Sequence, residues 1–158
     1  MWRDYLLCAA AVLPLIGQAQ AAAPQTGKYC VYGKGKSYDM LLVRQNPDGT
    51  LAFGLSSWTA DGSNFSVAGS ARPSGSGWAY RDQMTAANPD DRCGVDLTQS
   101  ADGTWRVTTV DGARCEGLAG HGAVLYGADV FPARSRAGDA PAKLGMEDLQ
   151  RIGCDRRQ

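Results

Sequence analysis

The sequence predicts an all-β fold: a small antiparallel β-barrel or sandwich of about seven strands, with a short C-terminal helix and two disulfides. Three observations lead to this prediction. Asp-Gly pairs, which tolerate the positive φ angles of tight hairpin turns, recur at Asp48, Asp61, Asp102 and Asp111. The segments between them are short, and several alternate apolar with small or polar residues. Four cysteines follow the N-terminal region, as in small exported domains.

The first six predicted strands lie between these turns. The alternation is clearest where Val95 and Leu97 flank Asp96, and where Trp105 and Val107 flank Arg106. Period-two alternation indicates one buried and one solvated sheet face. The six segments are residues 38–45, 51–58, 65–72, 77–84, 93–100 and 104–111.

The remaining elements are less regular. A seventh strand is expected around residues 123–131, followed by an exposed connection over 132–143. Residues 145–154 form the one predicted helix, because Met146, Leu149 and Ile152 recur at helical spacing. Acidic residues early in this segment and Arg151 late in it suit the helix dipole.

The four cysteines of the exported chain are Cys30, Cys93, Cys115 and Cys154. An even count allows two disulfides in three connectivities. We favour Cys93 with Cys115 across one hairpin, and Cys30 with Cys154 between the chain ends. Neither a redox nor a zinc spacing is present, and a single histidine offers few metal ligands, so we expect no metal and no cofactor.

The chain begins with features of an export signal. One basic residue, Arg3, precedes an apolar run over residues 6–16, and small residues follow, with cleavage fitting after Ala21 or Ala23. The run is too short to span a membrane. We therefore assign residues 1–23 to a signal peptide and residues 24–158 to a single secreted β-domain, which is periplasmic or secreted.

The charge balance argues against a nucleic-acid partner. The chain carries 16 Lys and Arg and 16 Asp and Glu residues, whereas nucleic-acid binders usually show a basic excess or stripe. We therefore expect no nucleic-acid partner.

Candidates for catalysis are weak. The one histidine, His121, lies between two glycines, and a pairing of Glu116 with Asp129 is one of many that the acidic residues allow. No nucleophile elbow or phosphate loop occurs. Trp58, Trp78 and Trp105 lie in predicted strands and are expected in the core or on a sheet face rather than on a sugar-stacking platform. We therefore expect no enzyme.

The stretch RPSGSGWAY, residues 72–80, carries the functional hypothesis. Pro73 restricts φ, and Gly75 and Gly77 permit a tight reversal. Ser76, Gly77 and Tyr80 read S-G-x-x-Y, which resembles the signature loop of the bacterial periplasmic lysozyme inhibitor families. The resemblance implies a small secreted β-fold whose loop enters the lysozyme cleft, where the serine and tyrosine hydroxyls bind the catalytic carboxylates. The alternative is that Trp78 and Tyr80 are same-face strand residues behind a turn.

The leading hypothesis is a periplasmic binding protein that inhibits a lysozyme or other peptidoglycan hydrolase by inserting this loop. Ser76, Gly77 and Tyr80 would be the target-binding residues. One alternative is a structural or envelope-associated β-domain without an enzyme target. Another is an immunity protein against a cell-wall-degrading toxin. A small hydrolase using His121 or a carboxylate pair is the least favoured reading. Exposure of Tyr80 at a tip would favour the first hypothesis, and packing in the sheet would favour the second.

Overall fold

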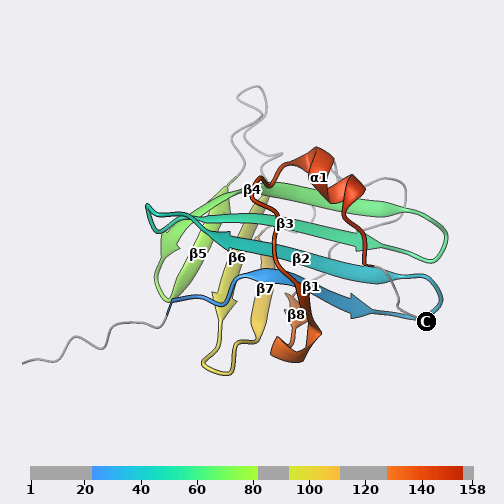
Figure 1. Cartoon of the computed structure of the whole chain (residues 1–158), viewed down its shortest axis with the longest axis horizontal. Helices are drawn as coiled ribbons and strands as arrows, with labels where there is room; N and C mark the ends of the chain where they lie inside the picture. The colour runs from blue at the N-terminus through green and yellow to red at the C-terminus, as the bar shows by residue number, and fades with distance from the viewer. Residues whose placement is uncertain (1–22, 82–92, 111–127, 155–158) are drawn as a thin grey trace, which may run out of the picture.

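The computed structural model describes residues 23–81, 93–110 and 128–154. Within these ranges the chain is built almost wholly of β-strands (Figure 1). The strands are β1 (Gly27–Tyr32), β2 (Tyr38–Gln45), β3 (Leu51–Trp58), β4 (Asn64–Ser74), β5 (Gly77–Arg81), β6 (Gly94–Gln99), β7 (Trp105–Val110), β8 (Ala128–Phe131) and β9 (Arg136–Gly138). A 3-10 turn, η3 (Ala133–Ser135), precedes β9, and one helix, α1 (Met146–Arg151), lies near the C-terminus.

All nine strands form one antiparallel sheet in the order β8-β7-β6-β5-β4-β3-β2-β1-β9. The sheet curls into a half-barrel (Figure 1). Strand β4 makes the corner, because its residues up to Ala71 pair with β3 and its last three residues pair with β5. Only Pro132 and η3 join β8 and β9, so the two edge strands are held close to one another.

Three hairpins of the sheet share one turn design. The turns run over residues 46–50, 59–63 and 100–104, and each contains an Asp-Gly pair with the glycine at positive φ. In each turn the Asp carboxylate accepts the backbone N–H of the residue two positions later, at 3.0 Å, and a neighbouring hydroxyl as well. The prediction of Asp-Gly turns is thus confirmed at Asp48, Asp61 and Asp102, and Asp111 lies outside the described residues.

The concave face of the sheet encloses the main core. Alternate residues of nearly every strand point to it, which is the burial that the period-two pattern predicts. Trp105, Phe53 and Tyr29 are fully buried at its centre. The other buried members are Leu41, Val43, Leu51, Leu55, Phe65, Val67, Ala71, Cys93, Val95, Leu97, Val107 and Phe131.

A second core lies on the convex face, beneath α1 (Figure 1). Leu149 of the helix is buried against Met40 and Leu42 of β2. Gly54 of β3 makes room for it, because a Cβ at that position would lie 2.6 Å from Cδ2 of Leu149. The disulfide between Cys30 and Cys154, with Cα atoms 5.9 Å apart, fixes the end of the chain to β1.

The structure corrects the predicted number of strands from about seven to nine. The missed strands are β1 and β9, and β9 falls inside the segment 132–143 that the sequence predicts to be an exposed connection. The six strands predicted between residues 38 and 111 and the helix are confirmed, with shifted ends. The seventh strand is confirmed over Ala128–Phe131.

The described residues contain one disulfide rather than the two predicted. It is the favoured pairing of Cys30 with Cys154. Cys93 is buried next to β6, and Cys115 lies outside the described residues, so their pairing stays a prediction. In the described ranges, no helix is both long and apolar enough to cross a membrane.

Candidate functional site

The predicted target-binding stretch forms the hairpin between β4 and β5. Ser74 pairs with Gly77, so the turn consists of Gly75 and Ser76 alone. Gly75 has a φ of 56°, a left-handed conformation that glycine adopts without strain. The side chain of Ser76 is exposed. The structure thus places Ser76 at the tip of a short, regular hairpin.

Gly77 is buried at the base of this tip. A Cβ at that position would overlap the carbonyl oxygen of Leu97 and lie 2.8 Å from Cγ2 of Thr98 on β6. The close backbone approach that this glycine permits is therefore to the neighbouring strand. Its missing side chain lets β5 and β6 meet at the point where the hairpin begins.

Tyr80 lies within β5 rather than at the tip. It pairs with Val95, and its ring makes an edge contact with Phe53 at a centroid distance of 5.2 Å. The same ring covers Gly69 of β4, whose absent side chain leaves the space for it. At a strand rise of about 3.3 Å per residue, Tyr80 lies roughly 10 Å along the strand from Gly77. Tyr80 is half-buried against the core, and the structure does not pair it with Ser76 at the tip.

Trp78 fixes the hairpin to the rest of the sheet. Its Nε1 donates a hydrogen bond to the carbonyl of Gly49, in the turn between β2 and β3, at 3.1 Å. Its ring packs on Trp105 at a centroid distance of 5.9 Å. Trp58 lies elsewhere and stacks on Tyr38 at 6.2 Å. The predicted packing in the core or on a sheet face is thus confirmed for all three tryptophans, but Trp58 and Trp78 are only half-buried and Trp78 also lines a cavity.

A cavity of about 290 Å³ opens directly beside the tip. It lies between the hairpin, the turn over residues 100–104 and the segment that leads into β1. Its lining residues are Ala23, Pro24, Gln25, Ser76, Trp78, Gln99, Ser100, Ala101 and Gly103. None of them carries a charged side chain.

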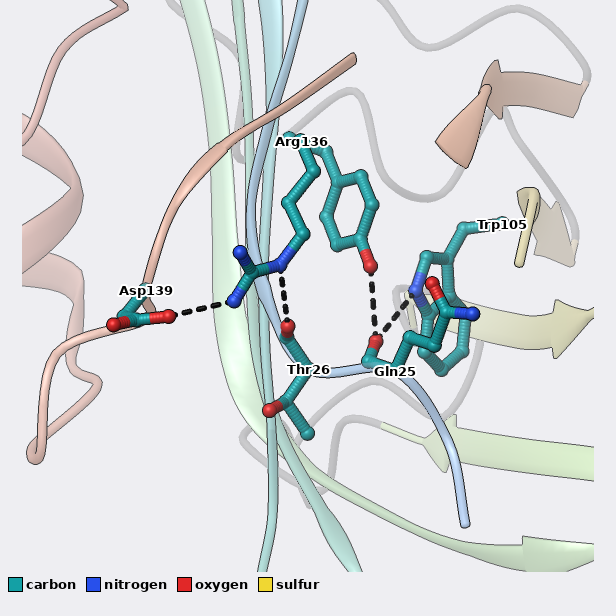
Figure 2. A network of polar contacts seen from close by, with 6 residues as sticks. Gln25, Thr26, Trp105, Arg136 and Asp139 are labelled. Carbon is teal, nitrogen blue, oxygen red and sulfur yellow. Dashed lines mark hydrogen bonds and ion pairs between the residues drawn. The ribbon is translucent and has the colours of Figure 1, made fainter. Parts of the chain in front are cut away.

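Residues 23–25 form one wall of this cavity, and hydrogen bonds of residues 25–26 hold the half-barrel together (Figure 2). The carbonyl of Gln25 accepts hydrogen bonds from Nε1 of Trp105 at 3.1 Å and from the hydroxyl of Tyr29 at 3.0 Å. Its N–H donates to Oε1 of Gln99 at 2.9 Å. These bonds connect the start of β1 to β6 and β7 across the interior.

Thr26, the next residue, is bonded to β9. The carbonyl of Thr26 accepts a hydrogen bond from Nε of Arg136 at 3.1 Å, and Arg136 also pairs with Asp139 at 2.6 Å (Figure 2). Gln25 and Thr26 thus connect the start of β1 to β6 and β7 on one side and to β9 on the other. No local sequence pattern marks Gln25 or Gln99, because their contact joins segments 74 residues apart.

The predicted catalytic candidates do not form a described site. His121, Glu116 and Cys115 lie outside the described residues. Asp129 lies in β8 opposite Val107. In the part of the chain that the structure describes, no group of three or more His, Cys, Asp or Glu side chains could hold a metal ion.

Among the described residues, the carboxylates of three hairpin turns have clearly lowered pKa values. Hydrogen bonds from Thr50 lower the pKa of Asp48 below 3.8. The Thr59 hydroxyl, followed by the Ser63 N–H, lowers the pKa of Asp61, and Ser100 with Thr104 does the same for Asp102. These shifts have a structural cause in the turn design and mark no reactive group.

Comparison with known proteins found no match to a protein-family model, to a curated protein or to a solved structure.

Proposed function

We propose that the protein is an exported, non-enzymatic binding domain that inhibits a lysozyme or other peptidoglycan hydrolase through the β4–β5 tip. The observation that carries the proposal is the exposure of Ser76 on a two-residue turn. A tip this short projects a hydroxyl with little backbone around it, which suits entry into an active-site cleft.

The base of the tip supports the proposal because it is rigid. Gly77 lies against the backbone of β6, and Trp78 is bonded to the turn between β2 and β3. A rigid hairpin loses little conformational entropy when it docks. A serine hydroxyl that donates to a buried carboxylate of the target would contribute about 1.5–3 kcal/mol.

The two hydroxyl residues take different places in this proposal. Ser76 is the group that enters the cleft. The ring of Tyr80 is held by Phe53 and Gly69, so Tyr80 meets the target along the flank of the hairpin. Gly77 lets β5 pack closely against β6 at the base of the tip.

Export is part of the proposal. The disulfide between Cys30 and Cys154 is compatible with an oxidising compartment such as the periplasm or the extracellular space.

A second candidate is a structural or envelope-associated β-domain with no enzyme target. The packing of Trp78 and Tyr80 against the core favours it, because a role in the fold would by itself explain why these two aromatic residues are present. The two candidates predict different results when exposed hydroxyls are removed. A hydrolase inhibitor would lose inhibition, whereas a structural domain would change at most in stability.

The test measures inhibition of a panel of lysozymes by the wild type and by Ser76→Ala, Tyr80→Phe and the double variant, with thermal unfolding of each. We expect Ser76→Ala to keep the wild-type melting temperature and to weaken inhibition about ten- to a hundredfold. Ser70→Ala, at an exposed serine farther back on β4, is the matched control and should inhibit normally. A wild type that inhibits no member of the panel, or a folded double variant with full inhibition, would contradict the proposal and leave the second candidate.

A further inference from the structure

The side chains that line the cavity beside the tip suit the binding of an uncharged molecule with several hydroxyl groups. Its nine lining residues carry no charged side chain. A charged ligand that leaves water needs a charged or multiply hydrogen-bonded partner, because its desolvation is otherwise costly. The side chains of the lining therefore suit a neutral ligand, and in the chain cleaved after Ala23 the α-amino group of Pro24 would add one positive charge beside them.

One wall of the cavity is a fixed indole. Trp78 is half-buried, donates its Nε1 hydrogen to Gly49 and packs on Trp105. The exposed part of its ring therefore keeps one orientation. Aromatic rings present an apolar surface with a rigid shape, and the C–H face of a pyranose ring is the part of a neutral polyol that stacks on such a surface. Because the ring is already immobile, little entropy is lost on stacking.

Two polar side chains of the cavity have no protein partner among the described residues. The hydroxyl of Ser76 is exposed, and the amide of Gln25 lies over Gly103, with its Nε2 2.8 Å from where a Cβ of that glycine would be. A hydroxyl and an amide each donate and accept hydrogen bonds, as sugar hydroxyls do. They lie on separate chain segments at the rim of the cavity.

The other polar side chains of the wall are already used within the fold. Nε2 of Gln99 donates to the carbonyl of Gly103 at 3.1 Å, and the hydroxyl of Ser100 lies 3.1 Å from the carbonyl of Thr104. These bonds hold the wall in place, while Ser76 and Gln25 keep their bonding capacity. A site with a fixed apolar wall and a few convergent polar groups is the usual composition of a small-molecule pocket.

We propose that this cavity binds one pyranose residue of a neutral glycan. Its volume of about 290 Å³ lies at the lower end of the usual range of ligand pockets, which suits one sugar ring rather than a longer stretch of chain. The inference does not depend on hydrolase inhibition, because it concerns a ligand of the cavity and not the target of the tip.

The experiment titrates the purified protein with two trisaccharides and follows the backbone and indole N–H signals by NMR. Tri-N-acetylchitotriose and cellotriose share the pyranose ring and differ in the acetamido group, so they separate an amino-sugar source from a plain glucan source. We expect saturable shifts at the Trp78 indole, Gln25 and Ser76 for at least one sugar, with a Kd of about 1 mM.

The variants locate the site. Gln25→Ala and Ser76→Ala should each weaken binding about fivefold to tenfold, as expected for one lost hydrogen bond. Trp78→Phe retains a smaller ring and should weaken binding further while allowing the fold to be checked by the same spectra. Gln150→Ala on α1 and Ser70→Ala on β4 replace exposed residues outside the cavity and should bind as the wild type does.

Two results would overturn the inference. One is the absence of saturable shifts with both sugars up to about 20 mM, some twentyfold above the expected Kd. The other is unchanged affinity in a folded Gln25→Ala, Ser76→Ala double variant. Neither result bears on hydrolase inhibition. A wild type that inhibits no hydrolase could still bind the sugar, and Gln25→Ala, which lies outside the tip, should weaken sugar binding without weakening inhibition.

Discussion

Three strand glycines of this protein are required by what lies against them rather than by a turn. Gly54 accommodates Leu149 of α1, Gly69 accommodates the ring of Tyr80, and Gly77 accommodates the backbone of β6. In each case a β-carbon would overlap a named neighbour. Strand glycines often mark such close approaches, and here they place the helix, the aromatic flank of the tip and the tip itself.

The contact between Gly69 and Tyr80 predicts an energetic coupling. Gly69→Ala should lower the free energy of unfolding by about 1–3 kcal/mol, because the ring of Tyr80 must move to admit the methyl group. In a Tyr80→Leu background the same substitution should cost markedly less, since the smaller side chain leaves space. Urea denaturation of the four proteins of this cycle measures the coupling. Equal costs in both backgrounds would show that the ring is not the obstacle.

Substitution of two neighbouring glycines of the tip should change stability by very different amounts. Gly77→Ala should destabilise the fold by about 1–3 kcal/mol, because the added methyl group meets the backbone of β6, which cannot rotate away. Gly75→Asn should change stability by less than about 0.5 kcal/mol, because nothing lies within 4 Å and asparagine tolerates a φ of 56°. Thermal unfolding of the two variants, side by side, tests the contrast. A well-tolerated Gly77→Ala would contradict the packing described for β5 and β6.

At the level of elements, the repeated Asp-Gly turn explains which strands the sequence reveals. Strands β2, β3, β4, β6 and β7 adjoin such turns, and β6 and β7 also alternate apolar with polar residues. The Asp-Gly pair and the alternation each lie within a few consecutive residues, so both can be recognised in the sequence.

Strand β9 could not be found in this way. Its three residues, Arg136–Gly138, have no alternation and adopt strand geometry by pairing with Lys28 and Tyr29, far away in the chain. Non-local pairing also accounts for β1, whose boundaries no Asp-Gly turn marks. The sequence therefore predicts the fold class and the middle of the sheet but not how its edges meet.

The turn carboxylates predict how stability depends on pH. The folded-state pKa values of Asp48, Asp61 and Asp102 lie below 3.8 because each accepts hydrogen bonds within its turn. The unfolded chain therefore binds protons first as the pH falls. The contribution of these groups is present above about pH 5 and is lost as the pH falls through their folded-state pKa values.

Urea midpoints measured between pH 7 and pH 2 should accordingly decline below about pH 4. The triple variant Asp48→Asn, Asp61→Asn, Asp102→Asn should be less stable than the wild type at pH 7 and should show a shallower acid decline. Glu147→Gln removes an exposed carboxylate outside the turns and should retain the wild-type profile. An acid decline that is identical in the triple variant would assign it to other groups.

At the scale of the whole molecule, closure of the half-barrel depends on contacts between distant segments. Residues 25–26 reach β6, β7 and β9, and the candidate sugar cavity lies where residues 23–25 meet the β4–β5 hairpin and the turn over residues 100–104. The tip could be predicted from its turn residues. The cavity could not, since Gln25, Trp78 and Gln99 come from separate parts of the chain and share no motif.

The disulfide between Cys30 and Cys154 should be a major source of stability. It joins residues 124 positions apart, for which chain-entropy models give about 4–5 kcal/mol. The double variant Cys30→Ser, Cys154→Ser should lose a large part of this amount in urea denaturation. Peptide mapping of the wild type should find Cys30 linked to Cys154 and Cys93 linked to Cys115, with no free thiol. A free Cys30 in exported protein, or a double variant of unchanged stability, would contradict the role assigned to this bond.

The same bond changes how the molecule would carry a mechanical load. A force applied to the chain on the outer sides of Cys30 and Cys154 passes through the sulfur–sulfur bond. The strands between them lie in a covalent loop and bear almost none of the tension. A protease or translocase that threads a single strand could draw in the ends but would meet a closed ring, and the sheet would come apart under traction only after the bond had been reduced.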